Sequence, residues 1–200
     1  ENRVSFPLDR LLPAALEASR KNGHIYGIPI QPHSELLWVR KDLLNAAGKS
    51  RPETTDDVLA LARHFHDPAS GRYGIAWNAQ RGQPLGQSMA HFFAAFGQPL
   101  LDGEGQPAFD TARGLEAARY ALKLLEVSPP DILTMAWDQR IQRFAGGQVA
   151  MTYGWGARAY RVETDPDSRV QGKALYCPAP HAPGTDPVTA PLPLAEQVVC

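Results

Sequence analysis

The stretch FAGGQVAMTYGWG, residues 144–156, turns from a helix into a strand and then into a loop. Phe144 is the last apolar residue of a helical pattern, and Gly146 and Gly147 follow it with the left-handed backbone that closes a helix C-terminus. The next residues, 149–151, form an apolar run typical of a short buried strand. A helix that leads directly into a buried strand predicts helices packed on a sheet.

Strand and helix patterns alternate on both sides of this stretch. Apolar runs predict further strands at residues 24–30, 73–77 and 173–177. Apolar spacing and end signals predict helices over 14–21, 55–65, 85–96, 111–126, 135–144 and 157–162. The proline-rich segment 178–193 cannot be helical and predicts an extended connector. This alternation favours the α/β class, with a sheet flanked by helices.

Capping residues and apolar spacing make specific predictions for three helices. The residues TTDD at 54–57, Asp110 with Thr111, and Thr134 are predicted to cap the helices that follow them. In the helix over 111–126, the side chains predicted to face the core are Leu115, Leu122 and Leu125.

The composition excludes several kinds of partner and site. Twenty basic and 21 acidic residues give a formal net charge of −1, without the basic stripe that nucleic acid or anionic lipid would require. No apolar run reaches the ~20 residues of a membrane span, and the opening residues ENR contain no export signal. Cys177 and Cys200 allow at most one disulfide, with two free thiols as the alternative, and exclude a cysteine-based zinc site. Neither a metal nor a cofactor is expected.

Reaction chemistry has weak support in the sequence. Ser88 lies in GQSMA, residues 86–90, which lacks the second glycine of a nucleophile elbow and falls inside a helical pattern. His64 and His66 are two positions apart on a helix, so they cannot form the i, i+4 pair of a zinc protease. We therefore do not expect an enzyme, and an α/β hydrolase that uses Ser88 remains the alternative.

Aromatic and polar residues follow the ends of several predicted strands. In open α/β sheets, ligands bind beyond the carboxyl ends of strands, and flat aromatic faces beside amide, hydroxyl and imidazole groups suit a sugar. Core packing is the alternative for the tryptophans, and an exposed loop position is the alternative for the histidine. The candidate ligand-binding residues are His33, Ser34, Trp77, Asn78, Tyr153 and Trp155.

Four stretches, in order and with matching gaps, carry a resemblance to a known family. They are YGIP at 26–29 leading to LWVRKDLL at 37–44, AGKSRPETTDDV at 47–58, GRYGI at 71–75, and the segment from Trp137 through FAGGQVAM to Trp155. Together they resemble the extracellular solute-binding proteins of ABC transporters, specifically the carbohydrate-binding family that includes maltose-binding protein.

The resemblance implies two α/β lobes joined by crossing strands, with a ligand held between lobes that close over it. It implies that residues 1–33 are the end of the first lobe and a crossover, that 34–190 are the second lobe, and that 191–200 return toward the first lobe. The second lobe is then expected to contain a mixed, mostly parallel sheet flanked by helices. On this reading the chain is a fragment of a longer protein.

The resemblance also implies a function without catalysis. The protein is expected to bind a sugar or polyol outside the cytoplasm, in the periplasm or lipid-anchored at the cell surface, and to deliver it to an ABC permease in the membrane. His33 and Ser34 fall where the family's first crossover reaches the cleft, and Trp155 falls where its aromatic platform lies. Trp77 and Asn78 match a loop that commonly faces the ligand.

Overall fold

The computed structural model describes residues 7–186 and 194–199, without the side chains of residues 14, 18, 30–33 and 194–199. The chain divides into two compact units, and each is described by itself. The first unit comprises residues 1–34 with 193–200, and the second comprises residues 35–192. The assignment of these units to a first and a second lobe, each with its crossover segment, stays a prediction.

The first unit contains two antiparallel strand pairs. β3 (Gly27–His33) pairs with β8 (Leu194–Val199), with a register shift between Pro29 and Gln31. β1 (Arg20–Lys21) pairs with β2 (His24–Ile25), and the intervening Asn22 and Gly23 both have positive φ, as a tight hairpin turn requires. The other elements are η1 (Leu8–Arg10) and α1 (Pro13–Ala18). The predicted helix over 14–21 is therefore too long, because the Asn-Gly pair forms a hairpin.

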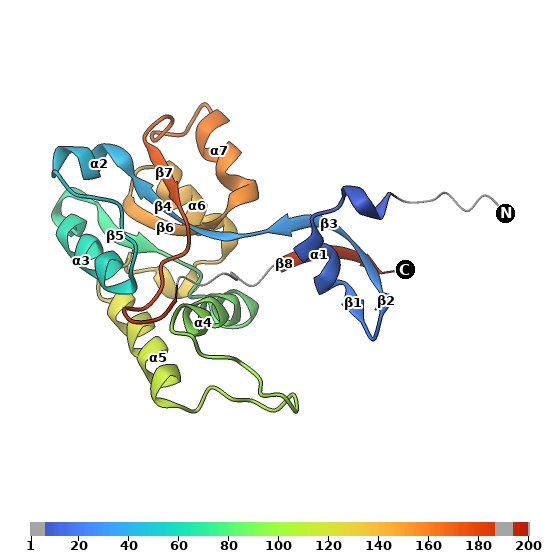
Figure 1. The fold of residues 1–200 in the computed structure, drawn as a ribbon. Coiled ribbons are helices and arrows are strands. Elements are labelled where there is room, and N and C mark those ends of the chain that lie inside the picture. Colours follow the sequence, from blue (N-terminus) through green and yellow to red (C-terminus); the bar gives the residue numbers. More distant parts are fainter. Residues whose placement is uncertain (1–6, 187–193, 200) are drawn as a thin grey trace. The chain divides into compact units, whose positions relative to one another are not determined.

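The second unit is built on a four-stranded sheet with the order β5-β6-β4-β7 (Figure 1). Its strands are β5 (Tyr73–Ala76), β6 (Val149–Trp155), β4 (Glu35–Arg40) and β7 (Ala174–Cys177). β5 and β6 are parallel, whereas β4 is antiparallel to both β6 and β7. The sheet is mixed, as expected: β5, β6 and β7 run in one direction, and β4, which lies between β6 and β7, runs against both of its neighbours.

Helices surround this sheet; α2 was not predicted, and the others have bounds close to those predicted. They are α2 (Lys41–Ala46), α3 (Thr55–Phe65), α4 (Gln83–Ala95), α5 (Ala112–Leu125), α6 (Trp137–Ala145) and α7 (Ala159–Thr164), with the 3-10 turns η2 (Pro68–Ser70), η3 (Ile132–Thr134) and η4 (Gly156–Arg158). Among the described residues, none of the helices combines the length and the apolarity needed to cross a membrane.

The predicted caps are confirmed for two helices and wrong for the third. Thr54 caps α3 in a reciprocal capping box with Asp57, and the Thr111 hydroxyl accepts the N–H of Gly114 at the start of α5. For α6, Ala136 occupies the N-cap position without a side-chain hydrogen bond, and Thr134 ends the separate turn η3, where its hydroxyl donates to the Asp131 carbonyl.

Aromatic contacts show which helices cover which face of the sheet. Tyr153 on β6 contacts Phe92 of α4 and Tyr120 of α5. Trp38 on β4 contacts Phe144 of α6 instead, and it projects from the opposite face because it lies in register with Thr152, next to Tyr153. The core therefore has two layers, with α4 and α5 on one face and α6 on the other.

The buried face of α5 differs from the predicted one. Leu115 and Leu122 are 51% and 62% exposed, so the expectation that they face the core is wrong. The buried stripe is instead Gly114, Ala117, Tyr120, Ala121 and Leu124. The small alanines of this stripe let α5 pack closely. The stripe was missed because small residues contribute less to an apolar pattern than leucines do.

Candidate functional site

Four elements of the second unit bring their ends to one edge of its sheet. β5 and β6 are parallel, so their carboxyl ends meet there, and β4 begins there with Glu35 in register with Trp155. α6 leads into β6 through a short turn at Gly146 and Gly147, and runs back along that strand. Its first residue, Trp137, therefore also lies at this edge, which is where the sequence predicted a ligand to bind.

Trp155 is the predicted site residue that is partly exposed at this edge. The sequence predicted that Trp155 lies in a loop. β6 instead continues through Trp155, so a strand holds the ring. Its ring centroid lies 6.3 Å from that of Trp137 at an interplanar angle of 32°, and we call these two residues the indole pair. The Arg158 guanidinium lies 4.9 Å from the Trp155 ring centroid, within cation–π range.

Asp138 orients the cation that covers Trp155. Its carboxylate forms an ion pair with Arg158, and Arg161 Nη1 lies 3.3 Å from the same carboxylate oxygen. The edge therefore presents aromatic faces beside guanidinium donors. This is the combination of stacking surface and fixed hydrogen-bond donors that binds polyhydroxylated molecules.

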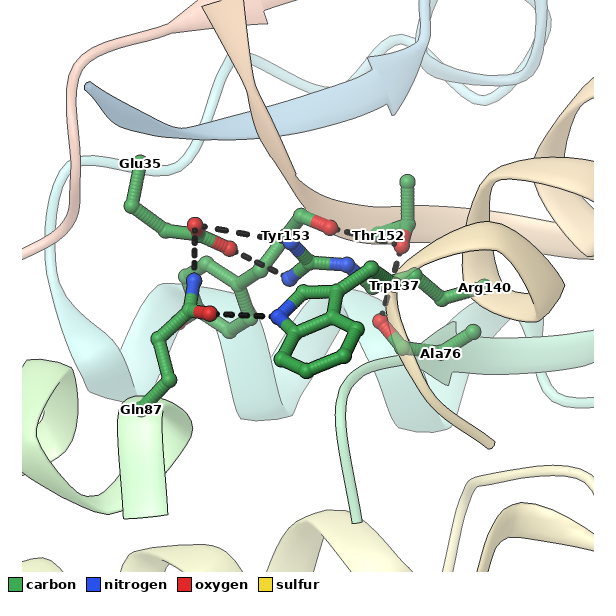
Figure 2. A network of polar contacts seen from close by, with 7 residues as sticks. All are labelled: Glu35, Ala76, Gln87, Trp137, Arg140, Thr152 and Tyr153. Atoms are coloured by element: carbon green, nitrogen blue, oxygen red, sulfur yellow. Dashed lines mark hydrogen bonds and ion pairs between the residues drawn. The ribbon is translucent and has the colours of Figure 1, made fainter. Parts of the chain in front are cut away.

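A partly buried polar network ends at Trp137, one member of the indole pair (Figure 2). Glu35 is 7% exposed and Arg140 is 1% exposed, and the two form an ion pair between β4 and α6. Gln87 of α4 donates from Nε2 to Glu35 Oε2 at 3.1 Å, and the Trp137 indole N–H donates to Gln87 Oε1 at 2.5 Å. We call Glu35, Arg140, Gln87 and Trp137 the Glu35 network. Sequence reasoning assigned none of its members to the site.

The two other aromatic residues predicted for the site, Trp77 and Tyr153, are buried in the core. The Trp77 indole N–H donates to Ser128 Oγ at 3.2 Å, and the ring packs against Phe92. The Tyr153 hydroxyl lies 2.8 Å from the Tyr120 hydroxyl, and burial raises the pKa of both phenols, so they stay neutral. Neither ring presents a face to solvent in this structure, which favours the core alternative for Trp77 and leaves Trp155 as the partly exposed aromatic among the predicted site residues.

The remaining predicted residues have different environments. Asn78 follows β5 and is fully buried, and neither of its side-chain amide atoms has a hydrogen-bond partner among the described residues. Ser34 is exposed and ends the first segment of the first unit. His33 ends β3, and its side chain lies outside the described residues. Their roles in binding stay predictions.

Ser88 and Cys177, the candidate nucleophile and a candidate thiol, are both buried. Ser88 lies inside α4, where it is 6% exposed, and not at a strand-to-helix turn, so the nucleophile-elbow pattern does not correspond to an elbow. Cys177 is a buried thiol whose pKa is raised by desolvation, which disfavours the nucleophilic thiolate form. Cys200, its possible disulfide partner, lies outside the described residues.

His91 lies on α4, one helical turn after Gln87 of the Glu35 network. The ring packs edge-on against Tyr153 at 5.0 Å and is buried. Desolvation lowers the pKa of His91, while the Glu35 carboxylate acts in the opposite direction and Arg140 adds to the lowering. The folded protein therefore holds His91 neutral at a pH where the unfolded chain begins to protonate it.

We expect the free energy of unfolding to fall as the pH drops below about 6.5, the ordinary pKa of an unfolded histidine. The unfolded state then binds one more proton than the folded state, which lowers stability by at most about 1.4 kcal/mol per pH unit until the folded pKa is reached. Urea denaturation between pH 7.5 and 5.5 measures this slope. The slope should be smaller in His91→Gln, and an identical slope in both proteins would contradict the assignment.

Two larger hollows in the second unit lie away from the sheet edge. One, of about 700 Å³, is lined by Phe93, Phe109, Leu115 and neighbouring residues between α4 and α5. Another, of about 580 Å³, is lined by Lys49, Arg51, His64 and neighbouring residues beside α3. Neither includes the indole pair, which is a surface at the edge of the sheet.

A family model, a sequence relative and solved structures all match the chain to solute-binding proteins. The family model described as bacterial extracellular solute-binding protein matches residues 4–195. The chain is 26% identical to a mannitol-binding protein of Pseudomonas aeruginosa over 152 residues, which cover 74% of this chain and 35% of that protein. It is 28% identical to a solute-binding protein of Agrobacterium radiobacter K84 solved in complex with ribitol, with a TM-score of 0.84 over 90% of this chain and 46% of that one.

A second solved structure, maltose-bound MalE3 of T. maritima, is 26% identical with a TM-score of 0.82, over 90% of this chain and 47% of that one. The chain thus spans between about a third and a half of the length of these three relatives. The fold is that of a periplasmic-binding-protein lobe, as the sequence indicated. Given the family match over almost its whole length and the agreement in fold, the chain belongs to the bacterial extracellular solute-binding protein family.

Proposed function

We propose that the chain forms part of the substrate-binding component of an ABC importer and binds a sugar or polyol without changing it chemically. The observation that carries the proposal is the indole pair, an aromatic surface that lies beside Arg158 at the edge where β5 and β6 end. Relatives that bind ribitol, mannitol and maltose support this ligand class. The near-neutral formal charge of −1 also suits an uncharged ligand.

We further propose that the protein acts outside the cytoplasm and delivers its ligand to membrane permease subunits. The family match supports this location and these partners. Thermal-shift measurements on the whole protein, with ribitol, mannitol, maltose and a panel of other sugars and polyols, test the ligand class. A panel of polyamines, amino acids and phosphate esters is the comparison. Stabilisation by these compounds alone would contradict the carbohydrate proposal.

Replacing Trp155 with alanine is expected to weaken binding of the stabilising sugar or polyol by roughly 30-fold, about 2 kcal/mol, because a stacking face is lost. Isothermal titration calorimetry measures the change. Phe109→Ala is the matched control, because Phe109 is a partly exposed aromatic that stacks on Phe93 away from the edge. The proposal requires weaker binding in Trp155→Ala and unchanged affinity in Phe109→Ala.

A further inference from the structure

Trp137 occupies a fixed place beside Trp155 because its indole N–H has a specific acceptor. The acceptor is Gln87 Oε1 on α4, at 2.5 Å, and the Nε2 group of the same amide donates to Glu35 Oε2 at 3.1 Å (Figure 2). Flipping this amide would direct its NH2 group at the indole N–H and its carbonyl at the carboxylate, and both contacts would be repulsive. The hydrogen-bond partners therefore allow only one orientation of the Gln87 side-chain amide.

The carboxylate that orients Gln87 is itself fixed. Arg140 binds both oxygens of Glu35, with Nη1 on Oε1 and Nη2 3.5 Å from Oε2, and both residues are buried. Paired buried charges are hard to displace because separating them exposes each one to a low-dielectric interior. The contacts thus run from Arg140 to Glu35, Gln87 and Trp137, joining α6, β4 and α4, and end at the indole pair.

We propose that Gln87, Glu35 and Arg140 are positioning residues that hold Trp137 beside Trp155, so that the indole pair is a preorganised binding surface. This inference rests on the proposed function, because it assigns a role in affinity to residues behind the proposed stacking face. A ring that is already oriented loses less conformational freedom when a ligand binds, so affinity is gained without an additional ligand contact. Trp137 itself becomes a further binding residue.

A double-mutant cycle between Gln87 and Trp137 tests the linkage. Gln87→Met keeps the length of the side chain and removes both hydrogen bonds, and Trp137→Phe keeps an aromatic ring but removes the N–H donor. We expect Gln87→Met to weaken binding of ribitol, mannitol or maltose to the whole protein by roughly three- to tenfold. In the Trp137→Phe background, the same replacement should have little further effect. If the fold-losses of affinity caused by the two replacements simply multiply in the double mutant, the two residues act independently and the proposal is overturned.

Gln98→Met is the matched control, because Gln98 is also a glutamine with several partners. Its Nε2 donates to the Pro99 and Ala108 carbonyls at 2.9 and 2.5 Å, and its Oε1 accepts from Thr111, all away from the indole pair. Gln98→Met should lower stability and leave affinity unchanged. Loss of affinity in both variants would show that affinity follows stability alone, which contradicts a positioning role.

A measurement without ligand separates this inference from the proposed function. The near-UV circular dichroism signal that Trp137→Phe removes reports the fixed geometry of the indole pair. We expect Gln87→Met to lose most of that signal and Gln98→Met to retain it. If the wild-type protein binds none of the sugars and polyols, the proposed function fails, while this spectrum still tests the positioning. An unchanged spectrum in Gln87→Met would overturn it.

Discussion

Replacing Arg140 with methionine is expected to lower the free energy of unfolding by about 3–5 kcal/mol, the typical effect of removing one partner of a buried ion pair. Methionine fills much of the volume of arginine, so the loss of stability comes mainly from leaving the Glu35 charge unpaired. The Glu35 carboxylate would remain buried with one hydrogen bond from Gln87 to compensate it. Urea denaturation monitored by tryptophan fluorescence measures the change.

Two further variants show whether burial is the cause. Arg63→Met removes an ion pair with Glu126 on the surface, where the two side chains are 54% and 66% exposed and 3.8 Å apart. We expect a loss below about 1 kcal/mol there, because solvent screens exposed pairs. A second replacement, Glu35→Leu in the Arg140→Met background, should recover much of the lost stability, because no uncompensated charge then remains. Equal losses in Arg140→Met and Arg63→Met would contradict the buried pair.

The parts of the fold that could be predicted depend on local chemistry. The capping box of Thr54 and Asp57 lies within one helical turn, and a threonine also caps α5, so the sequence alone locates both helix starts. β4 was missed because its apolar run is short and leads directly into α2, and such a run has no periodicity that separates strand from helix. Its direction, which makes the sheet mixed, depends on pairings between residues far apart in the chain.

The site shows the same division between local and distant signals. The sequence marked Trp155 as a candidate because the residue follows an apolar run and lies between glycines, and its role in binding stays a prediction. It could not locate the Glu35 network, whose members are joined by hydrogen bonds across 50, 52 and 105 positions. One signal was present: Arg140 lies three residues after Trp137 and four before Phe144, on the apolar face of α6. A charged residue on a buried face predicts a buried partner.

Replacing Gly154 with alanine is expected to lower the free energy of unfolding by about 3 kcal/mol, the upper part of the usual range for overpacking. A Cβ at this position of β6 would lie 2.6 and 2.7 Å from Cε2 and Cζ2 of Trp38 on the neighbouring strand. The ring has no room to move, because it is fully buried and packs edge-on against Phe144 at 5.9 Å and Tyr176 at 5.4 Å.

The same replacement at Gly86 is the matched control, and there we expect the opposite sign. Gly86 lies on α4 with ordinary helical backbone, and an added Cβ would meet no atom within 4 Å. Alanine should therefore raise the free energy of unfolding by about 0.5 to 1 kcal/mol through its higher helix propensity. Urea denaturation measures the change in the free energy of unfolding for both variants. A Gly154→Ala protein as stable as the wild type would show that Trp38 does not cover β6. If that ring were elsewhere, the layer between the sheet and α6 would be packed differently, and α6 would no longer be held where its first residue, Trp137, lies beside Trp155.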